Sequence, residues 1–85
     1  MVRVPDPLRS YTERQAVVEA DGDTVGAVIA DLDRRFPGIR FRMVDEQNEI
    51  RSHMKVFVNE EPVRDLATPV AGSDEVTIMQ ALSGG

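Results

Sequence analysis

One segment of the sequence, "DTVGAVIADLDRRFPG", has the apolar spacing of a helix, and the rest of the chain must cover its apolar face. Asp23 or Thr24 can cap the first turn through a side-chain oxygen, and Pro37-Gly38 ends the pattern. The apolar residues fall on one stripe of a 3.6-residue helix: Val25, Val28, Ile29, Leu32 and Phe36. The segment therefore predicts one main helix with a single buried face.

Short segments in which apolar and other residues alternate lie on both sides of this helix and predict strands. They are "MVRVP" and "QAVVEA" before the helix, and "MKVFVN" and "EVTIMQ" after it. "IRFRM", directly after the helix, also alternates, because Ile39, Phe41 and Met43 are separated by arginines. We expect a short strand there, and turns or irregular chain from 59 to 74.

The order of these elements predicts an α+β fold. Two strands come first, then the helix, then further strands, so the first and last strands can lie side by side at the centre of a mixed sheet. The helix then packs across one face, which is the β-grasp arrangement. A chain of 85 residues has the length of one small domain, and we predict a single domain over 1–85 with four or five strands.

Composition argues against several classes of function. The chain has 15 acidic and 10 basic residues and a net charge of −5, whereas nucleic-acid binding depends on clustered Lys and Arg. It has no cysteine, which excludes disulfides, thiolate metal sites and cysteine nucleophiles. No stretch approaches the ~20 apolar residues of a membrane span, and "MVRVPDPLRS" lacks the apolar region of a signal peptide. We expect a cytoplasmic protein that binds neither nucleic acid nor membranes.

Candidate catalytic groups are few and poorly placed. His53 is the only histidine, and "DEQNE" lacks the ligand spacing of a calcium loop, so we interpret it as a solvated turn. Asp31 and Asp33 lie two residues apart on the predicted helix and do not face each other. The arginines between 34 and 42 are interpreted as a solvated edge. We expect no catalytic residue and no bound metal or cofactor.

The last four residues, "LSGG", directly follow the final predicted strand. Extended, they reach about 13 Å, at roughly 3.3 Å per residue. Glycines without a Cβ can thread a channel that is too narrow for other residues. The α-carboxylate at the tip, with an ordinary pKa of about 3.3–3.7, is ionised at neutral pH. We interpret these residues as a flexible arm that delivers the carboxylate of Gly85 into another protein's active site.

Three segments in this order resemble the ThiS/MoaD family of small sulfur carriers, which are relatives of ubiquitin. "DGDTVGAVIADLDRRFPGI" is similar to the family's capped helix, and "VFVNEEPVR" to its strand and turn. "GSDEVTIMQALSGG" is similar to its closing strand and Gly-Gly tail. The resemblance implies a ubiquitin-like β-grasp fold. The length and "IRSHMKVFVN" resemble the carriers that serve cysteine or secondary-metabolite sulfur pathways more than the shorter thiamin carriers.

The resemblance also implies a reaction and its partners. An E1-like adenylating enzyme of the ThiF/MoeB type uses Mg-ATP to convert the terminal carboxylate into an acyl-adenylate. A sulfur donor then forms a thiocarboxylate, which a sulfur-accepting synthase consumes. In this scheme Gly85 is the reacting group, Gly84 admits the tail to the channel, and Ser83 and Leu82 set its reach. The carrier binds no cofactor itself, and a free carrier is expected to be monomeric.

Strand alternation predicts a docking patch. If Val56 and Val58 face the helix, then Phe57 faces outward, and the same argument applied to the last strand turns Met79 outward. Exposed aromatic and Met side chains are frequent at binding hot spots. We therefore predict that Phe57 and Met79 dock the activating enzyme.

Other functions are compatible with the same sequence. The chain could be the small subunit of molybdopterin synthase, whose thiocarboxylate tail stays inserted in a larger subunit. It could also be a ubiquitin-like modifier that forms isopeptide bonds through Gly85. A third alternative is a plain β-grasp binding module whose tail has no role.

Overall fold

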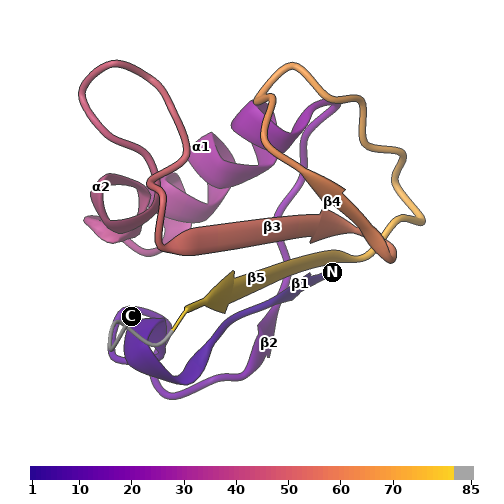
Figure 1. Ribbon diagram of the computed structural model, residues 1–85. Helices are drawn as coiled ribbons and strands as arrows, with labels where there is room; N and C mark the ends of the chain where they lie inside the picture. The colour runs from indigo at the N-terminus through magenta and orange to yellow at the C-terminus, as the bar shows by residue number, and fades with distance from the viewer. Residues whose placement is uncertain (82–85) are drawn as a thin grey trace.

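The computed structural model describes residues 1–81, and these form one mixed five-stranded sheet covered on one face by helices (Figure 1). The strand order is β2-β1-β5-β3-β4. The central pair, β1 and β5, is parallel, and the other pairs are antiparallel. The strands are β1 (Val2–Arg3), β2 (Val17–Val18), β3 (Met54–Val58), β4 (Glu61–Val63) and β5 (Val76–Gln80).

The main helix, α1 (Val25–Arg35), crosses one face of this sheet (Figure 1). Thr24 is its N-cap, because the Thr24 hydroxyl accepts a hydrogen bond of 3.1 Å from the backbone N–H of Ala27. The predicted apolar stripe is buried at four positions, and Phe36 packs partly against the core. The helix prediction is therefore confirmed, with Thr24 rather than Asp23 as the cap.

The core lies between the sheet and the helices. Val2 and Val4 are almost fully buried, which confirms the alternation predicted for the first strand. Val2 pairs with Val76 and Arg3 with Thr77, so the first and last strands are central neighbours as predicted. The inner face of the sheet contributes Val2, Val4, Val18, Met54, Val56, Val58, Val76 and Ile78 to this core. The predicted α+β, β-grasp arrangement is confirmed.

The strand predicted at 39–43 is wrong, because this segment forms a short helix, α2 (Ile39–Met43). Ile39 and Met43 are both fully buried and lie four residues apart, a spacing that fits a helix as well as a strand. Phe41 lies between them and is 61% exposed. The Asp33 carboxylate accepts hydrogen bonds of 3.0 Å from the N–H groups of Gly38 and Arg40, which holds the first turn of α2 against the end of α1.

The irregular chain predicted after residue 59 is wrong at β4, which pairs with β3 across a two-residue turn. Asn59 has φ 58° in this turn, a left-handed conformation that Asn tolerates. Pro62 cannot donate to a sheet ladder, but β4 is the edge strand and needs no partner on its outer side. A three-residue 3₁₀ helix, η1 (Asp6–Leu8), follows β1 and buries Leu8.

Gly22 is required by close packing where the chain passes α1. A Cβ on Gly22 would lie 2.5 Å from the backbone nitrogen of Val28 and 2.7 Å from the carbonyl carbon of Ala27. Both contacts are with helix backbone, which cannot move aside cheaply.

Among the helices that the structure describes, none is long and apolar enough to cross a bilayer.

Candidate functional site

The central strand β5 carries the chain toward the predicted tail. Gln80 pairs with Met54 at the end of the β5–β3 ladder, and the N–H of Ala81 donates a hydrogen bond of 2.8 Å to the carbonyl oxygen of His53. The chain is thus anchored to the sheet as far as Ala81. The predicted tail residues lie outside the described part of the chain: Leu82, Ser83, Gly84 and Gly85.

The predicted docking residues lie on the open face of the sheet, opposite the helices. Met79 is 52% exposed, and Phe57 is partly buried. Phe57 pairs with Thr77, and Lys55 pairs with Met79, so Phe57 and Met79 are diagonal neighbours on one face. The structure brings the two residues together, and their role in docking stays a prediction.

A second surface lies beside the end of β5, at Gln80 and His53. It consists of two adjoining hollows, and we call it the tail-side surface: Tyr11, Phe41, Arg42, Arg51, His53 and Gln80. The Arg42 guanidinium lies 5.9 Å from the centre of the Tyr11 ring, and its Nε donates a 2.7 Å hydrogen bond to the Tyr11 hydroxyl. This hydrogen bond raises the pKa of Arg42 above its ordinary value. Arg51 lies 4.8 Å from the centre of the Phe41 ring.

Sequence reasoning missed this surface. The arginines between 34 and 42 were expected to form one solvated edge, but the structure separates them. Arg34 and Arg35 pair with Asp31, whereas Arg42 contacts Tyr11. Phe41 is exposed because residues 39–43 form the helix α2. The spacing of Ile39 and Met43 also fits a helix, and a helix predicted there would have placed Phe41 on the surface.

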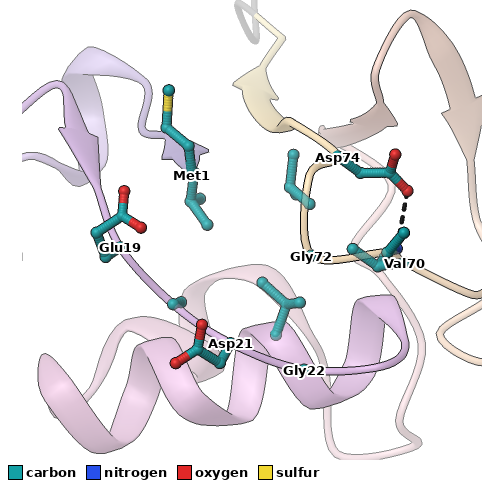
Figure 2. A pocket seen from close by; sticks show the side chains of 12 residues that line it. Met1, Glu19, Asp21, Gly22, Val70, Gly72 and Asp74 are labelled. Atoms are coloured by element: carbon teal, nitrogen blue, oxygen red, sulfur yellow. Dashed lines mark hydrogen bonds between the residues drawn. The ribbon is translucent and has the colours of Figure 1, made fainter.

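A small acidic hollow lies at the opposite end of β5, near Val76 (Figure 2). Glu19, Asp21 and Asp74 line it together with Met1, and its volume is about 60 Å³. A typical small-molecule pocket has about 300–1,000 Å³, so this hollow is too small for a cofactor. The Asp74 carboxylate accepts hydrogen bonds from the N–H of Ala71 at 2.8 Å and from the Asn59 amide at 3.1 Å. Both bonds lower the pKa of Asp74, and they close the loop before β5.

The aspartates considered as catalytic candidates hold local structure. Asp31 accepts hydrogen bonds from the Asp21 N–H at 2.9 Å, from Arg34 and from Arg35. The Asp21 N–H and then the two guanidinium groups hold the pKa of Asp31 well below its ordinary value of 3.8. Asp31 therefore ties the segment before α1 to the helix surface.

The acidic segment "DEQNE" is organised as a turn, as predicted. One oxygen of the Asp45 carboxylate accepts hydrogen bonds from the N–H groups of Gln47, at 2.9 Å, and Glu49, at 3.0 Å. Asn48 has φ 67°, and Val44 and Ile50 form a β-bridge across the turn. The Asp45 carboxylate thus holds the turn together through these two backbone N–H groups.

Comparison with known proteins identifies relatives along the whole chain. The model of the ThiS family matches residues 2–85. The sulfur carrier protein CysO of Mycobacterium bovis is 43% identical over 89 residues, which cover 99% of this chain and 96% of that protein. This is the type of carrier that the sequence resembles.

Solved structures agree in fold. CysO in the BexX/CysO complex of Amycolatopsis orientalis matches with a TM-score of 0.91 and 37% identity, covering 99% of this chain and 97% of that one. SAMP1 of Haloferax volcanii matches with a TM-score of 0.78 and 28% identity, covering 99% and 96%. The fold is a ubiquitin-like β-grasp, and the family consists of small carriers rather than catalysts. On the full-length family match and the 43% identity, this chain belongs to the ThiS family.

Proposed function

We infer that this protein is a sulfur carrier whose C-terminal carboxyl group is activated and converted into a thiocarboxylate. The observation that carries this inference is the 43% identity to a curated sulfur carrier over 99% of the chain. The similarity to proteins named CysO favours a role in cysteine biosynthesis or a related sulfur pathway.

The proposed chemistry takes place on Gly85, in the active site of an E1-like adenylating enzyme. The carboxylate of Gly85 attacks the α-phosphorus of ATP, and pyrophosphate leaves, so that an acyl-adenylate forms. A sulfur nucleophile from the donor then attacks the acyl carbon, and AMP leaves. The product is a thiocarboxylate. ATP and Mg²⁺ belong to the enzyme, and the carrier needs no cofactor of its own.

The scaffold supports such a role because it holds the chain rigidly up to the tail. β5 is paired on both sides, with β1 and with β3, and Ala81 makes the last described backbone hydrogen bond. Four residues follow, from Leu82 to Gly85. When extended they reach about 13 Å, which is enough to carry the carboxyl group away from the sheet into a partner.

We propose that Phe57 and Met79 dock the activating enzyme. Both side chains lie on the open face, which none of the helices within residues 1–81 covers, and Met79 points outward from the strand that leads to the tail. A relative of this chain, CysO, forms a complex with BexX, which supports recognition of this fold by another protein. A sulfur-accepting synthase is the second partner that we propose.

A second candidate function is protein modification. The similarity to SAMP1, whose class is named small archaeal modifier protein, favours it at 28% identity. A modifier would use the same activated carboxyl group but would transfer it to a lysine amine of a target. The intact mass separates the two functions. A carrier gains about 16 Da when sulfur replaces oxygen, whereas a modifier forms covalent adducts the size of a protein.

An ATP–pyrophosphate exchange assay with a candidate E1-like enzyme tests the proposal. We expect exchange that depends on the full-length carrier and is absent for a variant without Gly84 and Gly85. Equal exchange with both proteins would contradict a role for the terminal carboxyl group.

A further inference from the structure

The tail-side surface is positively charged, although the protein is acidic. No Asp or Glu lines either of its two hollows, which contain Arg42, Arg51 and His53. Within residues 1–81, neither Arg42 nor Arg51 lies within ion-pair distance of a carboxylate, whereas Arg34 pairs with one carboxylate and Arg35 with two. With a net charge of −5, the chain has acidic groups to spare, but none is placed here.

Both guanidinium groups are held in position with donors left over. Arg42 uses only its Nε, on the Tyr11 hydroxyl, and Arg51 uses only its Nε, on the carbonyl oxygen of Phe41 at 2.9 Å. Each guanidinium also lies against an aromatic ring, Tyr11 for Arg42 and Phe41 for Arg51. The terminal nitrogens of both arginines thus make no hydrogen bond to residues 1–81. A guanidinium fixed in this way can bind a carboxylate with two parallel hydrogen bonds and little loss of side-chain entropy.

The position of the surface connects it with the tail. Gln80, the last residue of β5, lines one hollow, and His53, whose carbonyl oxygen bonds Ala81, lines both. Figure 1 shows α2, which carries Arg42, on the same side of the molecule as the end of β5. The tail-side surface therefore lies beside the last described residues of the chain, from which residues 82–85 continue.

We propose that the tail-side surface docks an acidic segment of the activating enzyme, with Asp or Glu carboxylates bound to Arg42 and Arg51. This proposal rests on the proposed function. Charge complementarity selects the partner, because unpaired arginines favour carboxylates, and the acidic remainder of the carrier disfavours the phosphates of nucleic acid. The surface is separate from the apolar docking patch of Phe57 and Met79. It orients the carrier so that the tail enters the active site, and it speeds the encounter.

Steady-state exchange kinetics test the proposal. We expect Arg51→Gln combined with Arg42→Gln to raise the KM for the carrier about tenfold and to leave kcat unchanged, because charge pairs act on association. The matched control is Arg34→Gln, which removes an arginine that already has a carboxylate partner and should leave KM unchanged. The KM of the wild type should rise with salt more steeply than that of the double variant.

The outcomes separate this proposal from the proposed function. If the wild-type carrier supports no exchange, the proposed function fails. If the wild type is active and the double variant has the same KM and salt dependence, only the docking proposal is overturned.

A titration without the enzyme gives an independent test. With tetraglutamate as the probe, we expect the NMR signals of the Nε–H groups of Arg42 and Arg51 to shift in the wild type at low salt. No shift would overturn the proposal. A chain that stops at Ala81 excludes another occupant, the carrier's own tail. If these arginine signals change on truncation alone, the tail occupies the surface and the proposal is wrong.

Discussion

The two ends of β5 differ in charge and in how their polar groups are used. At the start of the strand, the acidic hollow is lined by Glu19, Asp21 and Asp74 and by no Lys or Arg. At its end, the tail-side surface contains Arg42 and Arg51, and no Asp or Glu of residues 1–81 lines it. A strand of five residues spans only about 16 Å, at roughly 3.3 Å per residue, so the charges are separated over a short distance.

The difference indicates which end maintains the fold and which end meets a partner. Asp74 bonds the protein's own backbone and the Asn59 amide, and Asp31 bonds the N–H of Asp21, so carboxylates near the start are used internally. The arginines at the other end keep unused donors. Changes near the start should therefore alter stability, and changes near the tail should alter recognition.

The largest effect is expected at the tail itself. Deleting Gly85 should reduce ATP–pyrophosphate exchange by at least about 10³-fold, because the acyl-adenylate no longer forms at the correct position. The free energy of unfolding in urea should stay unchanged, because Gly85 lies beyond β5, the last strand of the sheet, which ends at Gln80. Exchange that survives the deletion would remove the functional distinction between the two ends.

The second prediction concerns the open face of the sheet, between the two ends. Phe57→Ala should cost about 2 kcal/mol of binding, roughly a thirtyfold rise in the KM for the carrier. The loss of stability should be smaller, about 1 kcal/mol, because Phe57 is only partly buried. Urea unfolding and exchange kinetics measure the two effects. Val17→Ala is the control, since Val17 is 38% exposed but lies on the edge strand β2. Equal effects of both variants on KM would contradict a localised docking patch.

The third prediction concerns stability near the acidic hollow. Gly22→Ala should lower the free energy of unfolding by about 1–3 kcal/mol, because the added Cβ meets the backbone of α1. Gly72→Ala, in the same hollow, is the matched control, since nothing lies within 4 Å of its added Cβ. Thermal unfolding compares the two variants. Exchange by the folded Gly22 variant should equal that of the wild type. A loss of exchange in a variant that is still folded would show that the start of β5 also takes part in recognition, which contradicts the comparison.

The smallest effect is a pH dependence. The pKa of Asp31 is lowered in the folded state, so its contribution to stability is complete above the ordinary value of 3.8 and is lost as the pH falls below it. Asp31→Asn should therefore be less stable than the wild type at pH 7, and the difference should shrink toward pH 2. Urea unfolding across this range measures it. A difference that stays constant with pH would contradict the role given to the Asp31 carboxylate.

Much of the fold could be predicted because its long elements have one dominant period. The α1 stripe and the alternation in β3 and β5 match the observed burial at the apolar positions except Phe36 and the outward-facing Phe57, which are both partly buried. Short elements could not be predicted in this way. Ile39, Phe41 and Met43 fit either period, and only the bonds from Gly38 and Arg40 to Asp33 select the helix.

The candidate site was predictable only in part. The outward direction of Met79 follows from strand alternation, because β5 is regular. The tail-side surface joins Tyr11, from the loop after η1, with Arg42 and with Arg51, which are 31 and 40 residues away in the sequence. Such a surface arises from tertiary packing, and local periodicity carries no information about it.

The most direct test is the intact mass of the carrier after incubation with the activating enzyme, Mg-ATP and a sulfide source. The account predicts a gain of about 16 Da, confined to the peptide that ends in Gly85. Blocking that carboxyl group as an amide should abolish the gain. A mass gain on any other peptide, or the same gain with the blocked end, would contradict it.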